Sequence, residues 1–132
     1  MDYVKIGGRA WNVSVTELSE NFTILYSENT GRVMSAGARM SLDPLGCFIG
    51  HKLTIRRRRG FEAEFDEFFD YVCKPRYSGI PVEIVHGQKT ISYDAYISNG
   101  ERSLKRIDEN SGVVYWDSLS LNVVPMEAQV RP

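Results

Sequence analysis

A single amphipathic segment, FEAEFDEFFDYVC (61–73), most constrains how this chain can fold. Its apolar residues recur at i, i+4, i+7, i+8 and i+11, which places them on one face of an α-helix. Acidic residues occupy the other face, and Pro75 ends the pattern because it disfavours a helical conformation at Lys74. The spacing therefore predicts one helix over 61–73, packed on a core through Phe61, Phe65, Phe68, Phe69 and Val72.

The sequence on either side of this helix predicts β-structure. Short apolar or alternating runs are separated by turn residues, as in strands of antiparallel sheets. We expect about eight to ten short strands. They fall over 4–6, 11–18, 22–26, 38–42 and 49–58 before the helix, and over 80–86, 90–98, 102–107, 113–116 and 119–124 after it. The predicted fold is mainly β (α+β), an antiparallel β-sandwich or partly open barrel with one central helix.

Glycine-containing turns separate the predicted strands. Asn99-Gly100 carries the strongest hairpin signal, and Asp43-Pro44-Leu45-Gly46 also has the chemistry of a turn. Further turns are predicted at Gly7-Gly8, at His86-Gly87-Gln88 and around Gly112. We interpret 27–46 as an extended loop or arm, and 125–132 as a C-terminal tail that follows Pro125.

The totals favour one globular domain over 1–132. The net charge of −1 gives the chain no general attraction to nucleic acid or to an anionic membrane. No apolar run approaches the roughly 18 residues that a membrane-spanning helix needs. Cys47 and Cys73 are too few for a disulfide framework, so we expect both thiols to be reduced in a cytoplasm.

No pattern in the sequence predicts catalysis or a cofactor. The serines lie outside any G-x-S-x-G motif, and no phosphate-binding G-x-x-x-x-G-K-[ST] loop is present. Cys47 and His51 are four residues apart, but the segment between them does not favour a helix, and His86 is distant in sequence. A zinc site normally needs three or four clustered ligands, so we predict no catalytic, cofactor or metal site.

Charge is strongly segregated around Gly60. A basic run, Arg56, Arg57, Arg58 and Arg59, precedes the acidic helix face formed by Glu62, Glu64, Asp66, Glu67 and Asp70. Complementary patches on one small domain suit a head-to-tail contact between copies, so these nine residues are our predicted subunit interface. Two alternatives stay open. The charges could pair within one chain across Gly60, or the arginine run could bind nucleic acid in a small regulatory protein.

Four stretches carry a family resemblance: TGRVMSAGARMSLDPLG (30–46), FDEFFDYV (65–72), GIPVEIVHGQKTISYDAYIS (79–98) and VYWDSLSLNVVPMEAQ (114–129). They resemble small structural proteins encoded in the tail gene cluster of long-tailed phages and prophages of Gram-positive gut bacteria. The strand–helix–strand order is similar to the tail-tube fold of tube, terminator, distal-tail and baseplate-hub proteins, whose copies form six-fold rings.

This resemblance implies a non-enzymatic virion protein of the tail tube, tail tip or baseplate region. It would be made in the cytoplasm of the bacterial host and carried in the virion tail. Its expected partners are copies of itself in a ring, six-fold in that family, and neighbouring tail proteins. No cofactor and no membrane partner are expected.

Overall fold

The computed structural model describes residues 4–33 and 37–132, and it confirms a mainly β fold with antiparallel pairing and one helix in that part of the chain. Long strands dominate this part. The elements in order are β1 (Val4–Ile6), β2 (Val13–Tyr26), β3 (Gly31–Val33), β4 (Arg39–Ser41), β5 (Pro44–Arg57), α1 (Glu62–Cys73), β6 (Ile80–His86), β7 (Lys89–Asp108) and β8 (Val113–Pro125).

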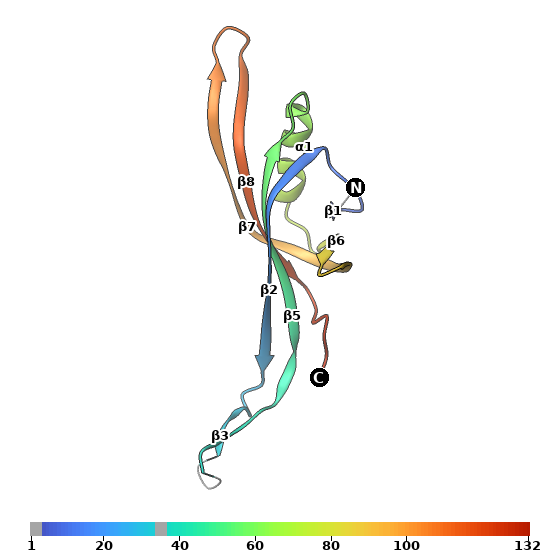
Figure 1. Ribbon diagram of the computed structural model, residues 1–132, viewed down its shortest axis with the longest axis vertical. Helices are drawn as coiled ribbons and strands as arrows, with labels where there is room; N and C mark the ends of the chain where they lie inside the picture. Colours follow the sequence, from blue (N-terminus) through green and yellow to red (C-terminus); the bar gives the residue numbers. More distant parts are fainter. Residues whose placement is uncertain (1–3, 34–36) are drawn as a thin grey trace.

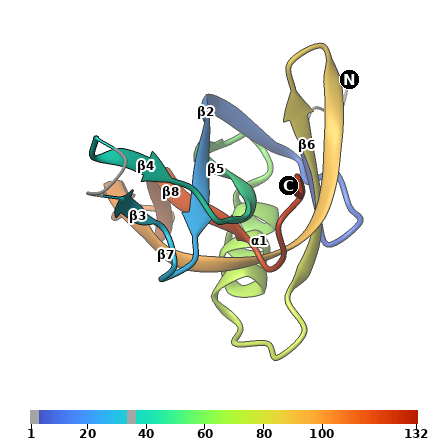
Figure 2. The same ribbon diagram turned by 90° about the horizontal axis from the view of Figure 1, so that it is seen from below.

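Six of the strands form one sheet in the order β1-β6-β7-β8-β5-β2, and β3 pairs only with β4. Every pair is antiparallel. The sheet curves around α1, as the view along its length shows (Figure 2). Because β1 and β2 are its end strands, each has one edge without a neighbouring strand. We call the gap between these two edges the seam.

Helix α1 packs on the core through the face that its periodicity predicts. Phe65 and Phe68 are each 1% exposed and Val72 is also buried, among core residues contributed by all six strands of the large sheet. Phe69 is partly buried and packs against the same core. The prediction for Phe61 is wrong: it precedes the helix in a non-helical conformation, which takes its side chain off the apolar face and leaves it 43% exposed.

Two long hairpins project from the sheet in opposite directions (Figure 1). We call the first the β2–β5 arm. It comprises 21–26 and 44–50, with the β3–β4 hairpin at its tip. The second is the β7–β8 arm, which comprises 104–108 and 113–116. The predicted extended arm over 27–46 thus corresponds to the tip and one side of the β2–β5 arm, with 34–36 outside the described residues.

Two predicted turns are wrong because longer strands run through them. β7 continues through Asn99-Gly100, and a register shift against β8 absorbs the irregularity. A Cβ atom at Gly100 would lie 2.9 Å from the Leu121 side chain, so glycine serves close strand packing here instead of a turn. β5 likewise begins at Pro44, and a Cβ atom at Gly46 would lie 2.6 Å from the Ala128 side chain.

Other boundaries agree with the sequence. Chain reversals occur at Gly7-Gly8, Gly87 and Gly112, all with positive φ, and β8 ends at Pro125. The tail that follows lies along β5: Val130 accepts a backbone hydrogen bond from Cys47, and the Gln129 amide makes two with the Ile49 backbone. In the described part of the chain, no helix is long and apolar enough to cross a membrane.

Candidate functional site

The acidic face of α1 is largely paired within the chain. Glu62 lies 3.5 Å from Arg57, and Asp66 lies 2.9 Å from Arg102. Glu64 and Glu67 both pair with Arg9, at 3.2 Å. Pairing within one chain across Gly60 therefore occurs for one of the predicted pairs, Arg57 with Glu62. The other partners of the acidic face, Arg9 and Arg102, were not indicated by the sequence.

The basic run divides into two parts. Arg57 stacks on Tyr115, and Arg56 lies 3.6 Å from Asp117, so both contact the base of the β7–β8 arm. Arg58, Arg59 and Asp70 make no ion pair with any residue in 4–33 or 37–132. Of the nine predicted interface residues, these three are the ones with charge left for a neighbour, and the predicted interface stays a prediction.

Arg9 fixes the segment between β1 and β2 to the helix. Its guanidinium stacks on the Trp11 ring at 4.0 Å while it pairs with Glu64 and Glu67. The Asn12 backbone N–H donates to the Glu64 carboxylate, and this hydrogen bond is the main reason that the pKa of Glu64 lies below its ordinary value. These contacts hold one end of the seam closed around α1.

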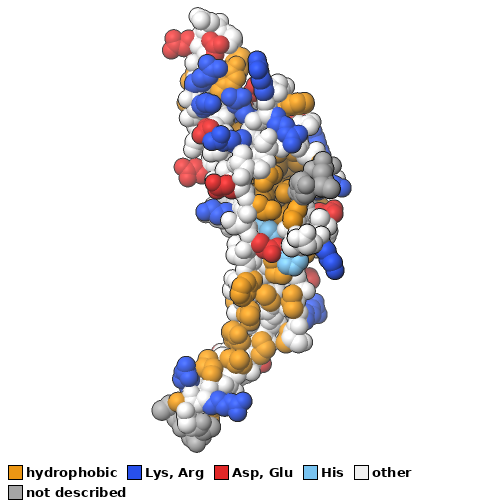
Figure 3. Space-filling view, in the orientation of Figure 1, with side chains coloured by type: hydrophobic (Ala, Val, Ile, Leu, Met, Phe, Trp, Pro, Cys, Tyr) orange, Lys and Arg blue, Asp and Glu red, His pale blue; other side chains and the backbone are white. Residues whose placement is uncertain are grey.

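The β2–β5 arm carries a surface of exposed apolar side chains. They gather on the lower arm in Figure 3. Phe22 is 70% exposed, and half or more of the Leu42 and Leu45 surfaces also face solvent. Exposed apolar patches on small proteins commonly mark interaction sites. The residues of this patch are Phe22, Ile24, Leu25, Tyr26, Leu42 and Leu45.

The β7–β8 arm, at the opposite end of the molecule, also carries exposed apolar side chains. Leu104, Ile107 and Val114 are substantially exposed there. The outer edge of β2, which runs from the body of the sheet into the β2–β5 arm, has no neighbouring strand among the described residues along its 14 residues. Such an edge presents unpaired N–H and C=O groups that can pair with another chain.

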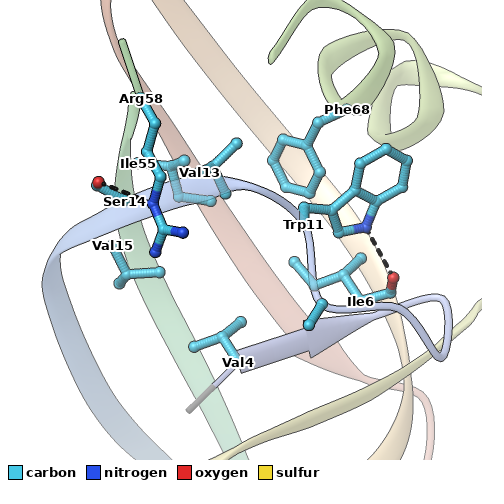
Figure 4. A pocket seen from close by; sticks show the side chains of 10 residues that line it. Val4, Ile6, Trp11, Val13, Ser14, Val15, Ile55, Arg58 and Phe68 are labelled. Atoms are coloured by element: carbon cyan, nitrogen blue, oxygen red, sulfur yellow. Dashed lines mark hydrogen bonds between the residues drawn. The ribbon is translucent and has the colours of Figure 1, made fainter. Parts of the chain in front are cut away.

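The seam contains an apolar pocket of about 290 Å³ (Figure 4). Val4 and Ile6 of β1 point into it from one side, and Val13 and Val15 of β2 from the other. Arg58 lies at its rim, where its Nε donates to Ser14 Oγ at 3.4 Å. The remaining lining is Ala10, Trp11, Ile55 and Phe68.

A polar cluster crosses the other end of the seam. Glu20 on β2 accepts hydrogen bonds from His51 Nε2 at 2.9 Å and from His86 Nδ1 at 2.6 Å through the same carboxylate oxygen, Oε2. The Tyr93 hydroxyl lies 2.7 Å from His51 Nδ1. Because neutral histidine carries one ring proton, the Nε2–H that donates to Glu20 leaves Nδ1 to accept from Tyr93.

Burial governs the protonation of this cluster. His51 is 1% exposed, and its desolvation lowers its pKa below the ordinary value in spite of the hydrogen bond to Glu20. Desolvation alone would raise the pKa of Glu20, but the hydrogen bonds with His86 and His51 lower it overall. Desolvation also raises the pKa of Tyr93. At neutral pH these directions favour an ionised Glu20 beside a neutral His51 and a neutral Tyr93.

Sequence reasoning missed this cluster because its members come from four strands. His51 and His86 were identified as the two histidines, but nothing near Glu20 distinguishes it from the other acidic residues. Across 4–33 and 37–132, no group of three or more histidine, cysteine or carboxylate side chains is placed to hold a metal ion.

Comparison with known proteins leaves the family open. No protein-family model matches the sequence, and no curated protein matches it at a significant level.

Proposed function

We propose that this chain is a non-enzymatic structural protein of a phage or prophage tail, in the tube, tip or baseplate region, and that it assembles with copies of itself and with neighbouring tail proteins. The resemblance of the four quoted stretches supports a particle of this class. The two arms support assembly as the mode of action, because a subunit that works by assembly needs surfaces that only another chain can cover.

One observation carries the proposal. Apolar side chains are exposed on two hairpin arms that project from opposite ends of a small body (Figures 1 and 3). Phe22, the most exposed apolar residue of the patch on the β2–β5 arm, lies on β2, the end strand. A neighbouring copy that added a strand to β2 would therefore satisfy backbone groups and cover apolar surface at one contact.

A ring contact of this kind is head-to-tail, so it needs two different surfaces on each copy. Arg58 and Arg59 lie at the end of β5, and Asp70 lies on the exposed face of α1. Since none of these three has an ion-pair partner among the described residues, they are the charges best placed to set the register between neighbours.

The experiment compares self-association of the wild-type chain with that of variants in the β2–β5 arm. We expect rings in negative-stain micrographs and a corresponding mass by light scattering. Phe22→Asp and Leu45→Asp should shift the protein to monomer, because each puts a charge into the covered patch. Tyr77→Asp is the matched control: Tyr77 is fully exposed in the loop after α1, away from both arms, and should leave assembly unchanged.

Two results would refute the proposal. One is a wild-type chain that stays monomeric at high concentration and is not recruited by the products of adjacent tail genes. The other is assembly of the Phe22→Asp and Leu45→Asp variants with wild-type affinity.

A second candidate function, nucleic-acid binding, is supported only by the charges of Arg58 and Arg59, which have no ion-pair partner in 4–33 or 37–132. It predicts an electrophoretic shift of DNA or RNA at physiological salt that is lost when Arg56–Arg59 are replaced by alanine. Absence of any shift removes this candidate and leaves the assembly proposal untouched.

A further inference from the structure

The cluster of Glu20, His51 and His86 connects β2 to β6, two strands that are not paired by backbone hydrogen bonds in the sheet. β2 is the last strand in the order β1-β6-β7-β8-β5-β2, and β6 is the second, so no backbone ladder connects them. The Glu20 carboxylate on β2 nevertheless holds His86 on β6 at 2.6 Å. This side-chain bond therefore spans the seam directly.

The seam is thus fixed at both ends by different means. At one end the covalent segment 7–12 connects β1 to β2, and Arg9 and Trp11 pack it on the helix. At the other end, the hydrogen bond between Glu20 and His86 joins β2 to β6. The apolar pocket adjoins the first of these ends, where Ala10 and Trp11 line it.

We propose that Glu20, His51 and His86 form an acid-sensitive latch that holds β2 against the β6–β7 hairpin, and that acidification releases it. The His86 side chain is substantially exposed to solvent, whereas His51 is shielded between Tyr93 and Glu20. Release would let β2 move away from β6 at the seam, beside the pocket.

Each element packed against the latch contributes a defined group. β2 supplies Glu20, β5 supplies His51, and β6 supplies His86. β7 supplies the neutral Tyr93 hydroxyl and, opposite His86 in the ladder, the cation Lys89. β8 supplies only the apolar Val123, opposite His51. Among the groups named here, Glu20 is therefore the one carboxylate, beside two histidines and a lysine.

The direction of the pH effect follows from these surroundings. As the pH falls below about 6.5, the unfolded chain protonates His51 more readily than the folded chain does, so the folded state loses stability. Burial of His51 is the cause of this loss, and it outweighs the opposing attraction of the Glu20 carboxylate. Below the ordinary carboxyl value of 4.5, Glu20 itself takes up a proton in the unfolded chain before the folded one, and the acceptor that both histidines share is lost.

The latch is tested on dilute, monomeric protein, so the result does not depend on the proposed assembly. The first measurement is the difference in Tm between the wild type and Glu20→Gln at pH 7 and at pH 3.5. We expect the variant to melt about 4 °C lower at pH 7, as loss of charge-assisted hydrogen bonds should cause in a domain of this size. The difference should be smaller at pH 3.5 than at pH 7, because protonation of the wild-type carboxylate removes the same interaction that the variant lacks.

Glu83→Gln is the matched control. Glu83 lies on β6, the strand that also carries His86, but it is outside the latch. Its side-chain partner is the Thr90 hydroxyl, at 3.3 Å. Its Tm should follow that of the wild type at both pH values. A Glu20→Gln difference that is the same at pH 7 and pH 3.5, or that Glu83→Gln reproduces, overturns the proposal.

The second measurement separates latch opening from unfolding. Nuclear Overhauser effects between the His86 ring and the Glu20 side chain should be present at pH 7 and lost at pH 4. Those between Trp11 and Phe68, whose ring centroids lie 5.3 Å apart, should persist at pH 4. If both sets disappear together, acid unfolds the whole domain; if both persist, the latch does not open. Either result refutes the proposed release.

Discussion

Arg102 on β7 donates a hydrogen bond of 2.9 Å to Asp66 on α1, while its guanidinium stacks on Phe69 at 3.9 Å and on Trp116 at 4.1 Å. One side chain therefore ties the helix to the base of the β7–β8 arm. Lysine keeps the charge but lacks the flat guanidinium that stacks between two rings.

We predict that Arg102→Lys lowers the free energy of unfolding by about 1–2 kcal/mol, mainly through lost stacking. Urea unfolding followed by tryptophan fluorescence measures it. Arg106→Lys serves as the control, because Arg106 stacks on Tyr115 but is exposed and has no acidic partner among the described residues. Equal losses for the two variants would show that stacking at the helix has no special role.

The apolar face of α1 makes a second prediction. Phe65→Ala should cost about 3–5 kcal/mol of unfolding free energy, because the ring is fully buried and its removal leaves a cavity. Phe61→Ala should cost less than about 1 kcal/mol, because that ring is largely in solvent. Comparable losses at the two positions in chemical denaturation would mean that Phe61 belongs to the core after all.

Tyr93 predicts how the protein responds to alkali. Its folded-state pKa is raised by burial, so the folded chain keeps the phenolic proton where the unfolded chain has released it. Stability from this group is complete below pH 10 and is lost as the pH rises above it. Replacement by phenylalanine should flatten the fall in Tm between pH 9 and about pH 11, whereas Tyr77→Phe, at a fully exposed position, should not. A wild-type slope in Tyr93→Phe would contradict the assignment.

Charge reversal tests the three interface residues that have no ion-pair partner among the described residues. Replacing Arg58 and Arg59 by glutamate should weaken self-association, and adding Asp70→Lys should partly restore it, since the new charges are again complementary. Sedimentation velocity reports the change. Reversal of Arg57, which already pairs with Glu62 inside the chain, should instead lower stability, and no rescue by Asp70→Lys is expected there. If the triple variant associates no better than the double one, the two patches do not meet.

The helix and several turns could be predicted because their causes are local. A period of 3.6 residues, Pro75 and glycines with positive φ act within a few residues, so they are readable without tertiary structure. The turn predicted at Asn99-Gly100 was wrong because the deciding interactions are not local. Its hairpin tendency is local, but the pairing of β7 with β8 on both sides of it favours a continuous strand.

The candidate site was less accessible to sequence reasoning. Glu20, His51 and His86 meet only after three strands have been aligned, and no spacing in the sequence encodes that alignment. The arms posed a related problem. Phe22 lies in a predicted strand with the pattern of a core residue, and its exposure depends on how far the hairpin extends past the rest of the sheet. Charge alone identified Arg58 and Asp70 as candidate interface residues. Whether each one has an ion-pair partner within the described residues depends on the fold.

The continuous pairing of β2 with β5 has a mechanical consequence. These strands run from the buried core at Ile55 to the exposed arm at Leu45, and their hydrogen bonds lie across the direction of the arm. A pull along the arm would load its two strands together, and the ladder that joins β5 to β8 over His51–Arg56 would resist it in shear, with its bonds loaded in parallel. A subunit joined to others through this hairpin would transmit tension from its tip to its core through the strongest direction of an antiparallel ladder.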